Sequence, residues 1–198
     1  MYELFSPKFI SNIEANRTVK DELLEAAARP SSRRRISVTD LVNMRQAYFR
    51  RIRPDGEIPL DRRQKMWAGT GFHELFGAAV SSEEYLEQFL ELDGIVGKVD
   101  IFEDEPVEVK TTSFMPKDIG GRSSYVDQLG MYCAMARKRS GQLLVYQRAV
   151  YGREPVLRAW RAEFRDLDTI AIEKRARRDL FAEALEMSDP STLPQCEW

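Results

Sequence analysis

Alternating hydrophobic and polar positions mark a run of short strands in the middle of the sequence. An apolar-rich run begins at Tyr85 and ends at Asp93–Gly94, a dipeptide that favours a tight hairpin turn. Residues 95–102 alternate well enough for a second strand, and the acidic residues 103–105 turn the chain. Residues 107–112 then alternate again. The pattern therefore predicts three consecutive strands joined by two tight turns.

Apolar positions three and four residues apart predict helices before and after these strands. The predicted helices run roughly from Pro7 to Ala28, from Ser37 or Thr39 to beyond Tyr48, from Asp61 to Val80, from Ser124 to Arg139 and from Asp166 to Glu186. Two further strands are predicted at 141–150 and 156–164, and the tail from Ser188 is expected to be irregular and to fray. A chain of 198 residues with this order of elements is most economically one α/β domain, or one domain with a small appendage.

The composition is that of an ordinary soluble protein, with 43% hydrophobic and 31% charged residues. No run approaches the ~18 apolar residues of a membrane span. The amino terminus lacks the basic and apolar regions of a secretory signal. Two cysteines, Cys133 and Cys196, are too few for a disulfide framework and fit a reducing compartment. We therefore expect a cytoplasmic protein that does not bind a membrane.

Charge is distributed unevenly along the chain, although the net charge is only -2. Between Arg29 and Lys65, eleven Arg and Lys residues face four acidic residues. From Glu83 to Glu108 the balance reverses, because Lys98 is the only base among ten acids. This asymmetry suits a basic segment that contacts phosphates and an acidic segment that holds a metal ion. Solvated helices explain the same charge runs equally well.

The acidic strands contain a candidate site. Strand alternation places Glu108 and Lys110 side by side, and Asp100 ends the preceding strand close to them. Two carboxylates and an ammonium at strand ends suit a divalent metal and an attacked phosphate. A hard cation such as Mg²⁺ takes oxygen ligands and lowers the pKa of a bound water, while a lysine stabilises developing charge. An acidic hairpin with a solvated lysine is the alternative, and it is the better explanation of this short pattern taken alone.

The helix before these strands carries His73, the only histidine of the chain. Met66, Thr70, His73 and Gly77 fall near one helical stripe, so we expect His73 to face inward. An inward histidine is more often a hydrogen-bonded core residue than a ligand. Because the helix immediately precedes the acidic strands, His73 is able to reach the same site.

The helix after the strands carries Gln128 and Tyr132, which are four residues apart and so share one face. An amide with a phenol one turn later is suited to hold a phosphate, a base edge or the lysine of the site. The alternative is a core tyrosine beside an exposed glutamine, which is commoner for an arbitrary pair.

Four pieces of the sequence follow one another in a defined order: His73 on a helix, Asp100, the triplet Glu108–Val109–Lys110, and Gln128 with Tyr132. This order and spacing resembles the PD-(D/E)XK nucleases, in particular their RecB-like branch and most closely its CRISPR-associated single-domain exonucleases. The resemblance runs from about Ile36 to Trp198. It implies an α/β, restriction-endonuclease-like fold with a mixed central β-sheet flanked by helices. Residues 31–198 would form this nuclease domain, and residues 1–30 a helical appendage that has no counterpart.

The resemblance also implies the chemistry and the role of each residue. The activity would be Mg²⁺- or Mn²⁺-dependent hydrolysis of phosphodiester bonds in DNA. The metal ligands would be His73, Asp100, Glu108 and the carbonyl of Val109. Lys110 would be the catalytic lysine, while Gln128 and Tyr132 would orient the substrate or Lys110. A histidine among the ligands would favour Mn²⁺ over Mg²⁺.

One departure from the family concerns iron. Many relatives hold an iron–sulfur cluster through one early cysteine and three cysteines near the carboxyl terminus. The early cysteine would fall near Met44 and is absent, and Cys196 resembles only the first of the final three. Because a [4Fe–4S] cluster needs four ligands, we expect none in this chain. Leu41, Met44 and Trp198 are predicted to supply an apolar contact in its place.

Two functions of different classes follow from the sequence. The first is an active nuclease, favoured as an exonuclease over an endonuclease, that acts on single-stranded DNA or DNA ends in CRISPR adaptation or DNA repair. The second is a non-catalytic module of the same fold that binds DNA ends or a protein partner such as a CRISPR integrase. Every expected catalytic residue is present, which favours the enzyme.

Overall fold

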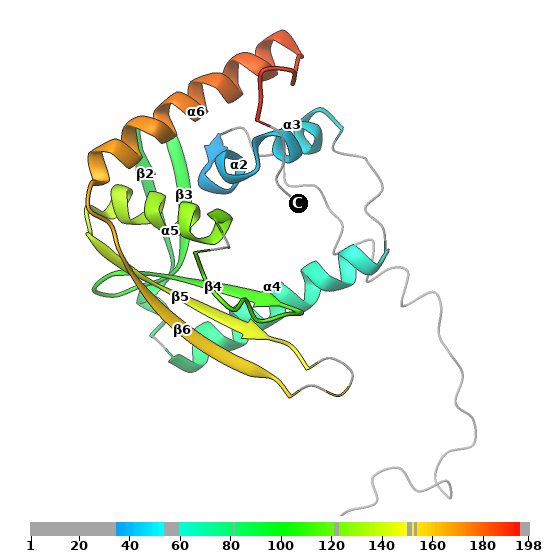
Figure 1. The fold of residues 1–198 in the computed structure, drawn as a ribbon, viewed down its shortest axis with the longest axis vertical. Helices are drawn as coiled ribbons and strands as arrows, with labels where there is room; N and C mark the ends of the chain where they lie inside the picture. The colour runs from blue at the N-terminus through cyan, green and yellow to red at the C-terminus, as the bar shows by residue number, and fades with distance from the viewer. Residues whose placement is uncertain are drawn as a thin grey trace, which may run out of the picture.

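The computed structural model describes residues 35–53, 60–80, 82–120, 123–149, 152 and 154–194 (Figure 1). These residues form one six-stranded mixed sheet flanked by helices, which confirms the predicted fold class. The strands are β1 (Ile36–Ser37), β2 (Leu86–Leu92), β3 (Ile95–Phe102), β4 (Pro106–Thr112), β5 (Ser140–Gln147) and β6 (Val156–Glu163). The helices are α2 (Val38–Val42), α3 (Met44–Ile52), α4 (Leu60–Val80), the short 3₁₀ helix η2 (Glu83–Tyr85), α5 (Ser123–Ala136) and α6 (Leu167–Met187). Among the described residues, no helix is both long and apolar enough to cross a membrane.

The sheet divides at β3. Strand β2 pairs antiparallel with β3 from Ile95 to Ile101, so the opposite edge of β3 is shared by two strands. Near its start β3 pairs in parallel with β1, through Ile95 and Val96. Near its end it pairs antiparallel with β4, through only Ile101 and Phe102. Because the pairing with β4 is so short, β3 and β4 separate where Asp100 faces the middle of β4. This separation of β3 from β4 is called the fork of the sheet below. Beyond this fork, β4 pairs in parallel with β5 and β5 pairs antiparallel with β6.

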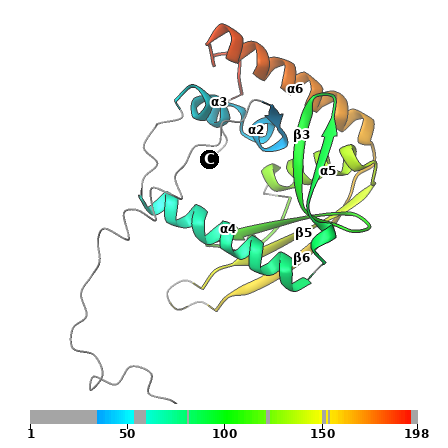
Figure 2. The ribbon, with the colours of Figure 1, turned by 180° about the vertical axis from the view of Figure 1, so that it is seen from behind.

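Helices cover the two faces of the sheet differently. The larger core lies among the sheet, α2, α3, α5 and α6, and its buried residues are Val38, Leu41, Met44, Ala47, Tyr48, Ile95, Val99, Met131, Tyr132, Phe181, Ala184 and Leu193. A smaller cluster of Leu129, Cys133 and Leu143 lies between α5 and β5, so Cys133 packs as a small buried hydrophobic residue. Helix α4 lies on the other face (Figure 2), where the ring of Phe72 stacks on that of Tyr146 with centroids 4.2 Å apart.

The single helix predicted from Ser37 through Tyr48 is in fact two helices. Ser37 caps α2, because its Oγ accepts from Asp40 N at 3.3 Å and its own N–H donates to Asp40 Oδ2 at 2.9 Å. Asn43 then leaves the helical conformation, with φ -132° and ψ 67°, and α3 begins at Met44. Helical spacing of apolar residues continues across the break, so the pattern alone did not reveal it. The first predicted strand also begins one residue later than expected, since Tyr85 belongs to η2.

The basic segment between Arg29 and Lys65 serves partly to hold the fold. Arg51 Nη2 lies 2.7 Å from Asp40 Oδ2, and both side chains are largely buried. Arg45 Nη2 donates to Pro190 O at 3.0 Å and so ties α3 to the chain beyond α6. These two arginines are therefore not simply solvated, nor are they free for DNA. The predicted amino-terminal helix, and the basic residues that precede residue 35, lie outside the described residues.

Candidate active site

Asp100 stands at the fork between β3 and β4. Its Oδ2 accepts a hydrogen bond from the backbone N–H of Val109 at 2.7 Å. Since β3 and β4 no longer pair at this level, the carboxylate replaces the backbone acceptor that a continuous ladder would have provided. The other oxygen, Oδ1, lies 3.3 Å from Nδ1 of His73 on α4. Asp100 thus connects the two diverging strands and α4.

Glu108, Lys110 and Gln128 form a closed triangle of hydrogen bonds beside the fork. Glu108 Oε1 accepts from Lys110 Nζ and from Gln128 Nε2, the latter at 2.7 Å. Lys110 Nζ also donates to Gln128 Oε1 at 2.9 Å. Gln128 Nε2 lies 3.1 Å from the hydroxyl of Tyr132, which donates to Lys98 O at 3.0 Å. The structure therefore brings the predicted side chains of β4 and α5 together, and Gln128 contacts the lysine instead of solvent.

A glycine makes the contact between α5 and β3 possible. A Cβ atom at Gly97 would lie 2.6 Å from the ring of Tyr132, which is too close for a real side chain, and 3.0 Å from Val38, which is a tight contact. The bare backbone of β3 therefore lets the Tyr132 ring cross it and reach Lys98 O. Tyr132 is almost fully buried, and this burial raises the pKa of its phenol. The hydroxyl therefore stays protonated and able to donate.

Burial dominates the electrostatics of Glu108, whose residue is only 2% exposed. Burial raises the pKa of Glu108 to about 7, Asp100 adds to the rise, and the ammonium of Lys110 opposes it. Its second oxygen, Oε2, is buried and has no hydrogen-bond partner among the described residues. A buried carboxylate oxygen without a partner is unusual in a folded protein, and its chemistry suits contact with a cation or a hydrogen-bond donor.

The described residues do not, however, form a ready metal site. No three His, Cys, Asp or Glu side chains within them are arranged so that they could together hold a metal ion. His73 and Asp100 are hydrogen-bonded to each other, and the unpaired oxygen of Glu108 is buried. Ligation by His73, Asp100, Glu108 and the Val109 carbonyl therefore stays a prediction.

The sequence predicts that one stripe of α4 faces inward, and only part of that stripe does so. Gly77 is buried against the side chain of Leu86, and the side chain of His73 is 31% exposed beside Asp100. Met66 and Thr70, on the same stripe, are exposed. Helix α4 projects past the end of β4 (Figure 1), so the stripe leaves the sheet before it reaches these two residues. His73 is consequently an edge residue with access to solvent.

Sequence reasoning missed a charged cluster next to Gln128. Asp127, the residue before Gln128 on α5, is the acidic member of this cluster. In the structure its carboxylate binds Nζ of Lys174, which is 1% exposed, and lies 3.0 Å from Nη1 of Arg177. Both partners lie on α6, some fifty residues away in the chain, and no local pattern announces such a contact. On the opposite side, the ring of Tyr125 lies 5.8 Å from Lys110 Nζ.

Comparisons with known proteins support the fold. No protein-family model and no curated protein sequence matches the chain. Among solved structures, a protein named SSO0001 is 18% identical with a TM-score of 0.51, covering 88% of each chain. LHK-Exo, an alkaline exonuclease from Laribacter hongkongensis, is 17% identical with a TM-score of 0.50, covering 84% of this chain and 93% of its own. A structure of LHK-Exo in complex with dAMP matches at 16% identity over the same shares, with a TM-score of 0.50. At such identities the similarity establishes a shared fold, and the CRISPR-associated branch stays a prediction.

Proposed function

We propose that this protein is a metal-dependent deoxyribonuclease that acts as an exonuclease on single strands or DNA ends. The observation that carries the proposal is the hydrogen-bonded triangle of Glu108, Lys110 and Gln128, with Asp100 bound to the neighbouring Val109 N–H at the fork of the sheet. Its fold is shared with an alkaline exonuclease, and the dAMP complex of that neighbour agrees with a deoxynucleotide substrate. Two carboxylates beside a fixed ammonium suit the hydrolysis of a phosphodiester.

The residues at the fork fit a divalent cation in their chemistry. Asp100, Glu108, the Val109 carbonyl and His73 offer oxygen and imidazole donors, which suit Mg²⁺ and Mn²⁺. The unpaired buried oxygen of Glu108 is the observation that favours a cation here. Binding would exchange the His73–Asp100 hydrogen bond for bonds to the metal. The chemistry supplied would be a more acidic bound water and a polarised phosphoryl oxygen.

The chain's own groups have separate tasks in this proposal. Lys110 stabilises the negative charge that develops on the attacked phosphate, because its Nζ is held between Glu108 Oε1 and Gln128 Oε1. Gln128 fixes both of these partners, and Tyr132 fixes Gln128 through its bond to Lys98 O. A lysine held in this way needs no reorganisation when charge develops.

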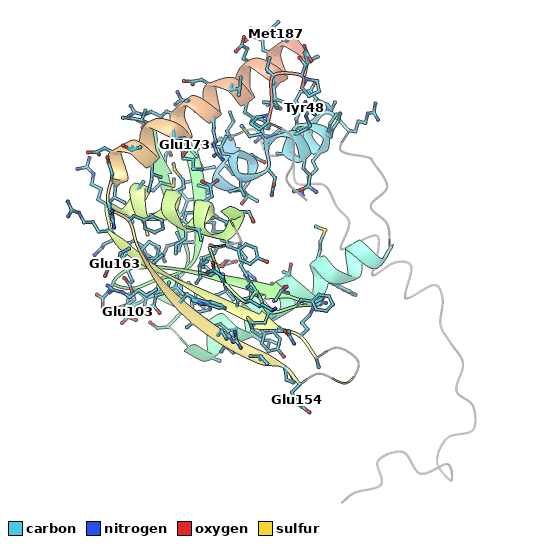
Figure 3. The ribbon with its side chains drawn as sticks, viewed as in Figure 1. Tyr48, Glu103, Glu154, Glu163, Glu173 and Met187 are labelled. Atoms are coloured by element: carbon cyan, nitrogen blue, oxygen red, sulfur yellow. The ribbon has the colours of Figure 1, made fainter. Side chains whose placement is uncertain are left out.

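The direct test compares linear with circular single-stranded DNA in Mg²⁺, Mn²⁺ or EDTA. We expect digestion of the linear strand in either metal, little of the circle, and none in EDTA. Asp100→Ala, Glu108→Ala and Lys110→Ala should each lower the rate by at least about 10²–10³-fold. Glu163→Ala is the matched control, because this carboxylate is exposed on β6, away from the fork (Figure 3). Undiminished cleavage by Glu108→Ala would contradict the assignment.

A comparison of rates in Mn²⁺ and in Mg²⁺ tests whether His73 is a metal ligand. Imidazole nitrogen is a softer donor than carboxylate and is better matched to Mn²⁺ than to Mg²⁺. His73→Ala should therefore reduce the rate more in Mn²⁺ than in Mg²⁺, as measured by initial rates with each metal at saturation. An equal loss in both would mean that His73 acts only by holding Asp100.

A second function rests on a different observation. Because no three ligands are grouped among the described residues, the alternative is a non-catalytic module of the same fold. Such a module would bind DNA ends or a protein partner, such as an integrase in CRISPR adaptation. Tight binding of DNA ends without hydrolysis in Mg²⁺ or Mn²⁺ would favour this function over the enzyme.

A further inference from the structure

Tyr125 is an aromatic residue of α5 that lies against the lysine of the candidate site. It stands three residues before Gln128 and seven before Tyr132, so the three side chains share one face of the helix. Lys110 Nζ lies over the ring of Tyr125, 5.8 Å from its centroid. Helix α5 therefore contacts the lysine twice, once through the amide of Gln128 and once through this ring.

Apolar packing holds the ring of Tyr125 in place. The side chain is partly buried and packs against the cluster of Leu129, Cys133 and Leu143 between α5 and β5. A ring that is fixed on one side by a packed cluster presents its other surroundings with a rigid surface, since close packing restricts its rotamers. The ammonium of Lys110 thus meets an aromatic face that is already in position.

The lysine needs more than its two hydrogen bonds to stay in one place. An ammonium has three N–H donors on a flexible four-carbon stem. Lys110 donates to Glu108 Oε1 and to Gln128 Oε1, and its side chain is still 20% exposed. Under the proposed function, the third N–H meets the attacked phosphate. The negative face of an aromatic ring attracts a cation, and so opposes movement of Nζ away from its two acceptors into water.

The core of the same protein contains a comparable arrangement. The guanidinium of Arg51 lies 2.7 Å from the carboxylate of Asp40, and its Cζ lies 5.5 Å from the ring centroid of Phe181. A carboxylate and an aromatic face together fix this cation, which joins α2, α3 and α6. Glu108 and Tyr125 stand in the same relation to Lys110, but at the fork, where a fixed cation is able to act on a substrate.

We propose that Tyr125 is a positioning residue for Lys110, whose ammonium its ring holds at the place where charge develops on the attacked phosphate. This inference rests on the proposed function. The ring acts through the lysine, so its contribution is to the transition state more than to the binding of DNA. A phenylalanine would serve equally well, because the lysine lies over the face of the ring.

Steady-state kinetics on a linear single strand test this role. Tyr125→Leu should lower kcat about three- to tenfold, the size of one cation–π contact to a partly desolvated ammonium, and should leave KM nearly unchanged. Tyr125→Phe should keep the wild-type kcat. In a Lys110→Met background, Tyr125→Leu should cause no further loss, because the ring then has no ammonium to hold. Tyr85→Leu is the control, since Tyr85 is another partly buried tyrosine and belongs to η2.

A second measurement does not depend on cleavage. The Cε–Hε resonance of Lys110 in an NMR spectrum recorded in EDTA, assigned by its loss in Lys110→Met, reports the ring current of a nearby aromatic face. It should move in Tyr125→Leu and keep its position in Tyr125→Phe. The resonance of the exposed Lys138, beyond the carboxyl end of α5, should stay in place in both variants. If Tyr125→Leu lacks a cooperative urea transition, Tyr125→Met replaces it, because methionine fills space without a π face.

Three results would each overturn the inference. One is a Lys110 resonance that does not move in Tyr125→Leu. Another is a loss of kcat that is equally large in Tyr125→Phe or in the Lys110→Met background. The third is a raised KM with an unchanged kcat, which would mean that the ring binds the substrate. Absence of hydrolysis by the wild type in Mg²⁺ or Mn²⁺ would instead reject the nuclease, and the resonance would still decide whether the ring holds the lysine.

Discussion

At the scale of single residues, Gln128 is the side chain on which the geometry of the candidate site depends most. An amide carries an acceptor and two donors, and all of them are used here. The carbonyl accepts from Lys110, while the amino group donates to Glu108 and lies against the Tyr132 hydroxyl. A carboxylate at this position would have no donor for Glu108, and an apolar side chain would leave Glu108 and Lys110 with only each other.

We therefore expect Gln128→Met to lower the rate constant kcat by about 10–100-fold, the range for loss of a group that positions a reacting one. KM should change much less, because the lysine acts mainly on charge that develops in the transition state. Steady-state kinetics on a linear single strand measure both constants. Gln142→Met is the matched control, since Gln142 also donates to a carboxylate, that of Glu105. An unchanged kcat in Gln128→Met would mean that Glu108 alone suffices to hold Lys110.

The sequence revealed some of these residues and not others, for physical reasons. Strand alternation placed Glu108 beside Lys110, and helical spacing placed Gln128 above Tyr132, because both periods are local properties of the backbone. The pairing of Asp127 with Lys174 and Arg177 depends on how α5 packs against α6, which no local period encodes.

At the scale of elements, local patterns predicted the strands and did not predict the fork. Strands β2 to β6 were predicted nearly at their observed bounds, because each alternates or is bounded by a turn. The early separation of β3 from β4 was not predicted, since β1 supplies the alternative partner through only two residues. That two-residue strand has no alternation to detect. The fork thus arises from competition between two partners for one edge of β3.

The closed end of the fork is fastened by Glu105, in the turn between β3 and β4. Its carboxylate accepts from Ser140 Oγ, from Gln142 Nε2 at 2.9 Å and from Arg161 Nε at 3.3 Å. These donors lie on β5 and β6, so one side chain joins the turn to two further strands. The hydrogen bond from Ser140, followed by those from Gln142 and Arg161, lowers the pKa of Glu105 below its ordinary value of 4.5.

Glu105→Gln should therefore reduce the free energy of unfolding near neutral pH by about 1–3 kcal/mol, the range for hydrogen bonds to a charged group. The pKa is lower in the folded than in the unfolded state, so the stabilisation is complete above pH 4.5 and is lost as the pH falls through the folded value. Urea denaturation of both proteins between about pH 3 and 7 measures the difference. A difference that stays constant over this range would show that the charge of Glu105 does not matter.

At the scale of the whole molecule, the segment that follows α6 packs back against α2 and α3. Leu193 is 2% exposed and belongs to the core cluster that contains Leu41 and Met44. Arg45 holds the carbonyl of Pro190 in the same region. The expectation that the tail frays from Ser188 was therefore wrong as far as Leu193, because one buried leucine and one arginine contact fix it. Trp198 and Cys196 lie outside the described residues, so their predicted roles stay predictions.

The contact between the segment after α6 and the core is apolar, and we expect it to form without iron. Leu193→Ala should lower the free energy of unfolding by about 2–5 kcal/mol, as for other buried leucines. Leu157→Ala is the matched control, because Leu157 is 49% exposed on β6 and should cost much less. Wild-type protein purified without oxygen should carry no stoichiometric iron or sulfide, and a chelator should leave its urea midpoint unchanged, since a structural cluster would contribute to folding directly. A loss of stability on chelation, together with a small effect of Leu193→Ala, would instead mean that a metal closes the molecule.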